Sequence, residues 1–237
     1  MNLRLYKTAE EVVSAFAEYF CLLANETISQ KRRFSVALSG GNSPKAVFQL
    51  LVSQYRDKLD WRQIDFFFGD ERNVPQTHKD SNYLMAKENL FDPLGISQEQ
   101  VFPVDTSLEP AAAASQYSEV IGNYFSDRPH AFDLVTLGLG DDAHTASLFP
   151  GTPVINEMRP VVKAVFVEKL DTYRITMSAP LLNMAVRIAF LLYGPGKAEA
   201  VHAVWEKEKD QTLYPAQLIR SDADWFLDEA AASRLKK

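Results

Sequence analysis

The sequence has little of several features that would each point to a particular class of protein. Its 237 residues include one cysteine, Cys21, so no disulfide can form within the chain. Such a low count is typical of proteins in a reducing compartment. Cys21 lies among apolar residues, and we expect its thiol to be buried and unreactive.

Long apolar runs are also missing. No stretch approaches the roughly 20 apolar residues that a membrane helix needs. The first residues, MNLRLYKTAEE, show no apolar signal segment. We therefore expect a cytoplasmic protein without a membrane partner.

Basic residues are few and scattered. The chain has 25 Lys and Arg against 31 Asp and Glu, a formal net charge of -6, and no basic block or tail. Binding to nucleic acid needs a positive face, so we expect no nucleic-acid partner. An acidic chain can still bind an anionic small molecule if a few basic side chains and helix N-termini gather at one place.

The remaining composition is that of an ordinary globular protein, with 46% hydrophobic and 24% charged residues. Apolar runs alternate with segments of helical periodicity, which predicts βαβ units and a mostly parallel sheet. We expect a single α/β domain over residues 1–237, with a small antiparallel excursion near Val161–Ser178. The expected strands cover 2–6, 34–38, 64–68, 132–137, 161–167, 173–178, 185–192 and 225–227, and further helices cover 81–90, 111–125 and 197–205.

The first two helices have recognisable starts. Thr8 is a suitable N-cap, and Glu11 three residues later completes a capping box. Ser43 is the expected N-cap of the second helix, with Pro44 as its first helical residue.

Polar, glycine-containing segments follow several of the expected strands. In an open α/β sheet such segments gather at the carboxyl ends of the strands, where ligands bind. The first is SGGNSP (39–44). Its glycines allow close backbone approach, and the helix N-terminus behind them offers N–H donors, which together suit a phosphate. An ordinary strand-to-helix turn fits the same residues, and the segment lacks the Gly-Lys-Ser/Thr ending of a Walker motif.

Two further segments each offer a cation. Arg72, in GDER (69–72), is placed to clamp an anion, with Asp70 or Glu71 to orient it. A solvated charged loop is the alternative. Lys197 follows Gly194-Pro-Gly196 at the start of a helix, where a lysine opposes the macrodipole and is slightly unfavourable without a ligand.

The segment 138–150 holds the best candidate for acid–base chemistry. His144 lies in a polar loop after a buried strand, and Asp142 is placed to fix its orientation or tautomer. The other histidines are His78, His130 and His202. None of them has metal-ligand spacing with a cysteine or another histidine, so we predict no catalytic metal.

A dinucleotide site is a competing interpretation of the same segment. Gly138-x-Gly140-x-x-Ala143 fits the nucleotide fingerprint after a strand. The fingerprint also needs a sustained helix and an acidic residue about 20 positions later. Here Pro150-Gly151 cuts the helix short, and Glu168 arrives late. No G-x-S-x-G elbow occurs, so a serine hydrolase of the α/β type lacks its nucleophile.

Taken together, these segments resemble those of the short-chain 6-phosphogluconolactonases, a family related to glucosamine-6-phosphate deaminases and isomerases. The resemblance covers nearly the whole chain, and its most specific part is HTASLFPG. The matching segments are SGGNSP (39–44), GDERNVP (69–75), DSNY (80–83), GLGDDAHTASLFPG (138–151), RITMSAP (174–180) and GPGKAEAV (194–201).

The resemblance implies a Rossmann-like three-layer α/β fold, with helices on both faces of a mostly parallel sheet. It also implies a phosphorylated sugar lactone as the small-molecule substrate, no cofactor, and a place in the oxidative pentose phosphate route. His144 would be the base that activates water. Residues implied to line the substrate site are Gly40, Gly41, Asn42, Ser43, Arg72, Arg174 and Lys197.

One position departs from the family, which usually has glycine where this chain has Ala143. If that position needs a positive φ, alanine costs on the order of 1 kcal/mol. Two other functions stay open at this point, a sugar-phosphate deaminase or isomerase and a non-catalytic sugar-phosphate sensor. We expect a monomer or a weak homo-oligomer.

Overall fold

A computed structural model describes residues 1–127 and 132–236 of the chain. Its main sheet has six strands in the order β1-β9-β8-β5-β2-β3, and every neighbouring pair is parallel. The first strand lies at one edge of this sheet. The strands are β1 (Asn2–Tyr6), β2 (Phe34–Leu38), β3 (Ile64–Phe68), β5 (Leu134–Leu137), β8 (Arg187–Leu192) and β9 (Asp224–Asp228).

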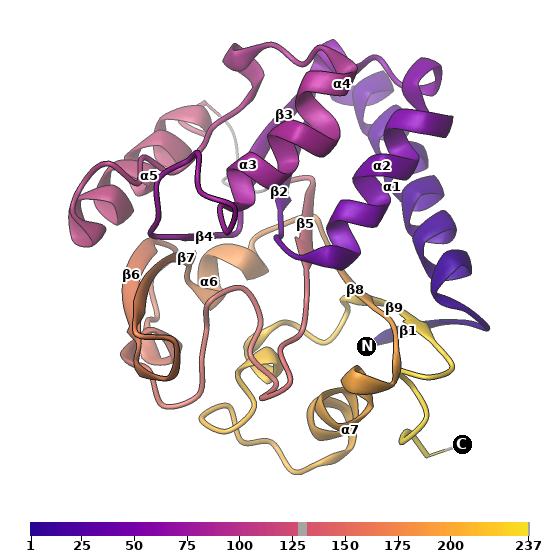
Figure 1. Ribbon diagram of the computed structural model, residues 1–237, viewed down its shortest axis with the longest axis vertical. Helices are drawn as coiled ribbons and strands as arrows, with labels where there is room; N and C mark the ends of the chain where they lie inside the picture. Colours follow the sequence, from indigo (N-terminus) through magenta and orange to yellow (C-terminus); the bar gives the residue numbers. More distant parts are fainter. Residues whose placement is uncertain (128–131, 237) are drawn as a thin grey trace.

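Helices cover both faces of this sheet, which confirms the three-layer α/β prediction (Figure 1). One face packs against α1 (Ala9–Lys31), α2 (Asn42–Gln54) and a third helical segment, made of α3 (Asn82–Ala86), the π-helical turn Lys87–Phe91 and α4 (Asp92–Leu94). The other face packs against α5 (Pro110–Tyr124), α6 (Ala179–Asn183) and α7 (Ala198–Glu206).

Strand β3 shows why its sequence is apolar without alternation. Ile64, Phe66 and Phe68 belong to the core beneath α1 and α2. Phe67, between them, belongs to the opposite core, where its ring lies against Tyr124 at the end of α5. Because successive side chains point to opposite faces and both faces are covered, every position of the strand must be apolar or paired.

A second, smaller sheet lies beside α5, with strands in the order β4-β7-β6. It consists of β4 (Asp70–Arg72), β7 (Thr172–Met177) and β6 (Val162–Val167), all antiparallel. The predicted antiparallel excursion is confirmed, and the solvated charged loop that was the alternative for GDER is contradicted, because Asp70–Arg72 forms a strand. Its Asp-Glu-Arg residues show no apolar pattern, and they become a strand through backbone pairing with β7.

The two helix starts differ from the sequence prediction in detail. Thr8 caps α1 by accepting a hydrogen bond from the Glu11 N–H at 3.2 Å, but the Glu11 carboxylate accepts from the Lys7 N–H instead of from Thr8. The prediction for α2 is wrong. Gly41, at φ 108°, occupies the N-cap, so the helix begins at Asn42 and Ser43 lies within its first turn. The glycine permits this early turn because it has no Cβ.

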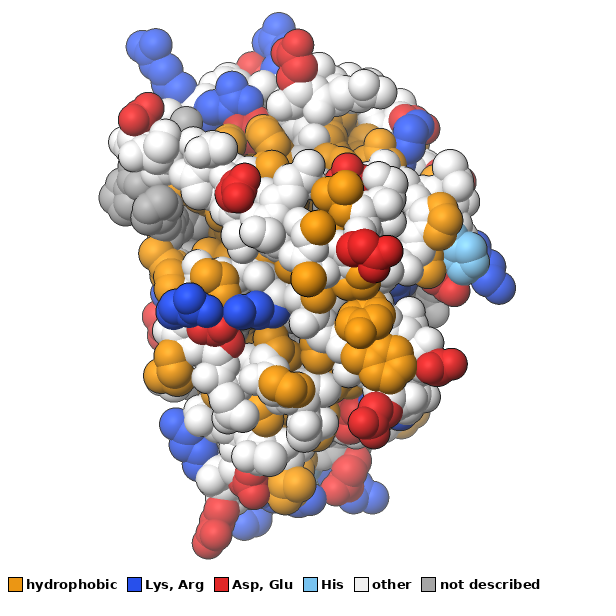
Figure 2. Space-filling model, turned by 90° about the vertical axis from the view of Figure 1, so that its left-hand side faces the viewer, with side chains coloured by type: hydrophobic (Ala, Val, Ile, Leu, Met, Phe, Trp, Pro, Cys, Tyr) orange, Lys and Arg blue, Asp and Glu red, His pale blue; other side chains and the backbone are white. Residues whose placement is uncertain are grey.

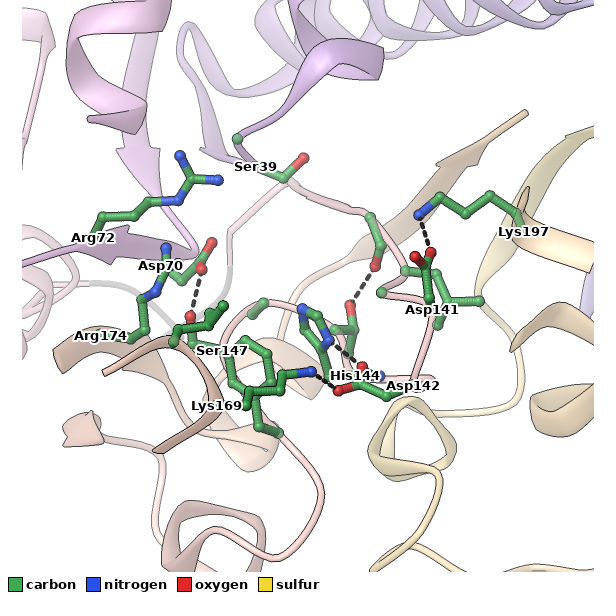
Figure 3. Close-up of a pocket in the computed structure, with 18 residues that line it drawn as sticks. Ser39, Asp70, Arg72, Asp141, Asp142, His144, Ser147, Lys169, Arg174 and Lys197 are labelled. Atoms are coloured by element: carbon green, nitrogen blue, oxygen red, sulfur yellow. Dashed lines mark hydrogen bonds and ion pairs between the residues drawn. The ribbon is translucent and has the colours of Figure 1, made fainter. Parts of the chain in front are cut away.

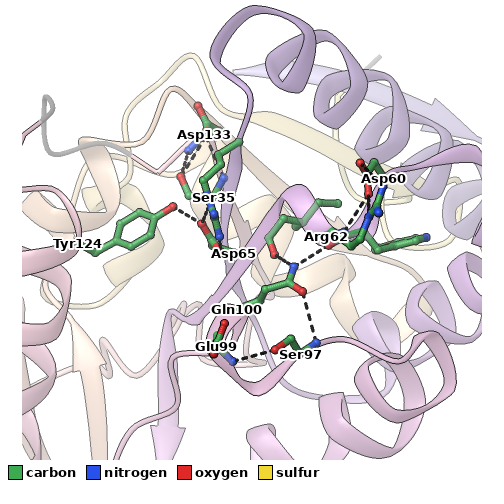
Figure 4. A network of polar contacts seen from close by, with 12 residues as sticks. Ser35, Asp60, Arg62, Asp65, Ser97, Glu99, Gln100, Tyr124 and Asp133 are labelled. Carbon is green, nitrogen blue, oxygen red and sulfur yellow. Dashed lines mark hydrogen bonds and ion pairs between the residues drawn. The ribbon is translucent and has the colours of Figure 1, made fainter.

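Figure 4 shows a polar network near the end of the main sheet where β2, β3 and β5 begin. The buried carboxylate of Asp65 accepts hydrogen bonds from Arg33 Nε and the Tyr124 hydroxyl, each at 2.6 Å. The buried carboxylate of Asp133 accepts from Lys31 Nζ at 3.1 Å. A buried charge is tolerated only when it is paired, so these contacts stabilise this end, and the opposite end holds the candidate site.

The face over α5 and the small sheet exposes separate hydrophobic side chains among charged ones (Figure 2). On the β6–β7 hairpin, Phe166, Leu170 and Tyr173 are each more than one third exposed. Among the described residues, no helix combines the length and apolarity that crossing a membrane requires.

Candidate functional site

A cavity of about 680 Å³ opens where the strands of the main sheet end (Figure 3). Its walls come from the segments that follow β2, β3, β5 and β8 and from the β6–β7 hairpin, so the predicted gathering of these loops is confirmed. The polar residues lining the cavity are Ser39, Asp70, Arg72, Asp141, Asp142, His144, Thr145, Ser147, Lys169, Arg174 and Lys197.

His144 is held by a chain of side-chain contacts. Its Nδ1 is hydrogen-bonded to Oδ1 of Asp142, and Oδ2 of the same carboxylate is ion-paired with Nζ of Lys169. An ionised carboxylate can only accept a hydrogen bond, so Nδ1 of His144 must be the donor. The neutral imidazole therefore carries its proton on Nδ1, which leaves Nε2 with a free lone pair. That is the state a general base requires.

The environment keeps Asp142 ionised. Burial by itself raises a carboxyl pKa, but hydrogen bonds from His144 and Lys169 outweigh burial and hold the pKa of Asp142 well below its ordinary value. The acceptor of the His144 proton is therefore charged at neutral pH.

An aromatic ring fixes the other side of the imidazole. Phe149 stacks on His144 with ring centroids 3.9 Å apart and planes inclined by 27°. Lys169 Nζ lies 4.8 Å from the centroid of the same ring, within the range of a cation–π contact. Phe149 itself is buried, so it gives the histidine a rigid support.

The backbone of the His144 loop is tightly turned. The Gly140 N–H donates to the His144 carbonyl at 2.8 Å, and the Ala143 N–H donates to the Gly140 carbonyl at 3.0 Å. Ala143 has φ 61°, so the positive φ considered from the sequence is present, at a cost on the order of 1 kcal/mol for alanine. A Cβ on Gly140 would lie 2.0 Å from the His144 ring, which explains glycine there.

Two arginines converge on the opposite wall. Arg72 on β4 is paired in register with Arg174 on β7. Arg72 Nη1 donates to the Asp80 carbonyl at 2.6 Å, whereas the buried Nε of Arg174 has no hydrogen-bond partner among the described residues. Burial, and secondly the charge of Arg72, lower the pKa of Arg174. An anion bound between the two guanidinium groups would relieve both effects.

Two carboxylates support this wall. Asp70 Oδ2 accepts from the Ser147 hydroxyl at 2.6 Å, which links β4 to the His144 loop. Glu71 is buried and accepts from the N–H groups of Arg72, Asn82 and Tyr83 at 2.7 to 2.8 Å. Glu71 thereby fixes the strand that presents Arg72.

Lys197 lies on the far side of His144, in the 3-10 turn Pro195–Lys197 before α7. Its Nζ is 3.0 Å from Oδ1 of Asp141. The exposed Asp141 carboxylate offsets a cation at a helix start, where the macrodipole disfavours it.

The glycine-rich segment is divided. Gly40 lines the cavity, and a Cβ there would lie 1.7 Å from the Asn82 side chain. Gly41, Asn42 and Ser43 form the start of α2 and are not among the residues that line the cavity. The structure thus brings six of the nine candidate residues to one cavity: Gly40, Arg72, Asp142, His144, Arg174 and Lys197.

The sequence did not single out Lys169, Phe149 or Ser147. Phe149 and Ser147 lie inside the HTASLFPG segment that carried the resemblance, so its specificity was a signal for them. Lys169 is a half-exposed lysine in a turn, and no local pattern marked it.

His144 is the one histidine lining this cavity among the residues that the structure describes. His78 and His202 do not line it, and His130 lies outside the described residues. Within residues 1–127 and 132–236, no group of three or more His, Cys, Asp or Glu side chains could hold a metal ion. The dinucleotide interpretation is contradicted, because turns and the 3-10 segment Pro153–Asn156 follow Gly140 in place of an α-helix.

Comparisons with known proteins agree with this architecture. The family described as glucosamine-6-phosphate isomerases/6-phosphogluconolactonase matches residues 7–227. A 6-phosphogluconolactonase of the cyanobacterium Nostoc sp. is 37% identical over 214 residues, which cover 88% of this chain and 87% of that protein.

Solved structures are similar over the whole chain. The 6-phosphogluconolactonase from Trypanosoma brucei superposes with a TM-score of 0.84 at 29% identity, covering 99% of this chain and 98% of that one. A monomeric glucosamine-6-phosphate deaminase also reaches a TM-score of 0.84, over 99% and 100% of the two chains, but at 20% identity. That second likeness shows a shared fold alone, so the fold by itself does not select the reaction.

Proposed function

The chain belongs to the family of glucosamine-6-phosphate isomerases and 6-phosphogluconolactonases, and we propose that within it the chain hydrolyses 6-phosphogluconolactone to 6-phosphogluconate. The observation that supports this most is the pairing of His144 with an ionised Asp142 in a cavity that also presents Arg72, Arg174 and Lys197. One general base beside several cations suits a substrate that has an uncharged lactone ester at one place and an anionic phosphate at another.

The proposed reaction is direct attack by water on the lactone carbonyl. His144 Nε2 removes the proton of the water as it attacks, while Asp142 holds the resulting imidazolium. Backbone N–H groups or a basic side chain stabilise the oxyanion of the tetrahedral intermediate. The ring C–O bond then breaks, and the imidazolium returns the proton to the leaving ring oxygen, which becomes a hydroxyl group.

The proposed substrate contacts follow the charges. Arg72 and Arg174 on one side of His144 and Lys197 on the other hold the anionic phosphate and the sugar hydroxyls, with Gly40 allowing close approach. Gly41, Asn42 and Ser43 do not line the cavity and act on the anion without direct contact, through the N-terminus of α2, whose N–H groups favour a negative charge.

We further propose that the chain acts in the cytoplasm as a monomer or a weak homo-oligomer, without a nucleic-acid partner. The single cysteine supports a reducing compartment, and the net charge of -6 supports the absence of a nucleic-acid partner.

The test is lactone hydrolysis with substrate generated in situ and spontaneous opening subtracted, for the wild type and His144→Asn. In the variant, kcat should fall by a factor of about 10² to 10⁴, the usual contribution of a general base. Near-normal turnover in a folded His144→Asn protein would remove that role. A folded wild type without hydrolysis would contradict the proposal, and release of ammonia from an amino-sugar phosphate would then favour the deaminase.

A further inference from the structure

Lys169 has a place in this cavity that neither the sequence nor the proposed reaction assigns. It lies in the 3-10 turn Glu168–Leu170 between β6 and β7 and reaches the His144 loop from another element (Figure 3). Its Nζ is ion-paired with Oδ2 of Asp142, the carboxylate oxygen that His144 does not use. Asp142 therefore has one oxygen on each partner, and its plane is fixed from both sides.

Lys169 also contacts the second support of the histidine. Its Nζ lies over the ring of Phe149, which stacks on His144. The lysine thus joins the two groups that orient the imidazole. Its side chain is 52% exposed, so burial does not force it into this position. An exposed lysine held at both a carboxylate and an aromatic face is a specific arrangement, since such a side chain otherwise keeps its rotamer freedom.

We propose that Lys169 is a positioning residue for the general base, holding Asp142 so that His144 keeps its proton on Nδ1 and presents Nε2 to the water. This rests on the proposed lactonase reaction. The role is that of an outer partner, because Lys169 acts on the base through Asp142 and not on the reacting atoms.

The charges around His144 give Lys169 a second effect. The ionisable groups that line the cavity with His144 are Asp141 and Asp142 of its own loop, Lys169, Lys197, and Asp70, Arg72 and Arg174 of β4 and β7. Asp141 is paired with Lys197, and Asp70 lies beside the two arginines. Without Lys169, the charge on Asp142 is balanced by the imidazolium alone. Protonated His144 is then favoured, and less of the base is available at neutral pH.

The test compares Lys169→Met with Lys169→Arg and a matched control. Lys169→Met should lower kcat about 10-fold, the low end for loss of an outer partner, with KM within about twofold because no substrate contact is lost. The acid limb of the kcat profile should move to higher pH by about one unit. Lys169→Arg keeps the cation and should stay near the wild type. Lys163→Met removes a lysine of β6 that pairs with Glu157 outside the cavity, and it should change nothing.

A readout without substrate separates this proposal from the proposed function. ¹⁵N NMR of the imidazoles, with His144 identified by its absence in His144→Asn, should show the Nδ1–H tautomer in the wild type. In Lys169→Met the signal should show mixed tautomers and a titration midpoint at higher pH. If the wild type hydrolyses no lactone, the proposed function is wrong. The NMR titration then still decides whether Lys169 controls the protonation of the His144–Asp142 pair.

Two results would overturn the role of Lys169. A Lys169→Met protein with a raised KM, but with unchanged kcat, pH profile and imidazole titration, would make Lys169 a substrate contact. A variant that matches the wild type in all four measurements would make it a surface lysine without a function in the site.

Discussion

At the scale of single residues, Arg72 of the arginine pair allows substrate binding to be tested apart from the chemical step. Arg72 lies on the wall opposite His144 and is oriented by backbone contacts of its own, to Glu71 and to the Asp80 carbonyl. Arg72→Ala should therefore raise KM about tenfold or more, the value of one charged hydrogen bond, and leave kcat nearly unchanged. Steady-state kinetics measure both constants.

The matched control is Arg62→Ala. Arg62 is 88% exposed, pairs with Asp60 and does not line the cavity, so its loss removes the same charge without the contact. Both constants should stay at their wild-type values. A lower kcat with an intact KM in Arg72→Ala would mean that Arg72 acts on the transition state instead of on bound substrate.

At the scale of elements, the loop between β5 and His144 is closely packed and hydrogen-bonded within itself. Gly140 packs directly against the imidazole, and an added Cβ would lie 2.0 Å from both Cε1 and Nδ1 of His144. Gly140→Ala should push the ring away from Asp142 and reduce kcat at least tenfold, because small misplacements of a catalytic group are costly.

The fold should survive this change, because the loop lies outside the sheet and Gly140 is not at a positive φ. Circular dichroism melts alongside kinetics would check this. Gly122→Ala adds the same methyl group to α5, where nothing lies within 4 Å of the new Cβ, and should keep full activity. Full activity in Gly140→Ala would show that the loop can move the ring without loss.

The elements also show what the sequence can predict. β3 could be predicted because both of its faces are covered, which requires an unbroken apolar run. β4 could not, because Asp70–Arg72 has no apolar pattern and becomes a strand only by pairing with β7, about one hundred residues later in the chain. The start of α2 was misplaced because Ser43 looks like a cap locally, whereas the positive φ of Gly41 starts the helix earlier.

The difference between residues marked by a local sequence pattern and residues brought in by a distant segment also applies to the site. Asp142 and His144 are two positions apart, and a local pattern reveals them. The partner Lys169 follows 27 residues later, and only the turn between β6 and β7 brings it back to the loop. Local patterns therefore predicted the residues that follow strands, and tertiary packing added the ones that support them.

At the scale of the whole molecule, two hydrophobic cores lie on opposite faces of one sheet. The reactivity of Cys21 measures how readily the core beneath α1 opens. Cys21 is 5% exposed and belongs to the same cluster as Phe34, Phe66 and Phe226 of the main sheet. Desolvation of the buried thiol raises the pKa of Cys21 to about 12. Only the thiolate reacts with a disulfide reagent, so the folded protein should react very slowly at pH 8.

Labelling therefore requires α1 to leave the sheet. Because α1 covers the strands that form the centre of this core, such an opening should cost much of the global free energy of unfolding, typically 5 to 15 kcal/mol. We expect one thiol to react rapidly in concentrated urea and negligible reaction in native buffer over the same time, measured by release of the chromophore of the disulfide reagent. Cys21→Ala, which leaves no cysteine, should give no signal in either state. Rapid stoichiometric labelling of the native wild type would mean that α1 opens independently of the sheet, and that the two cores do not unfold as one unit.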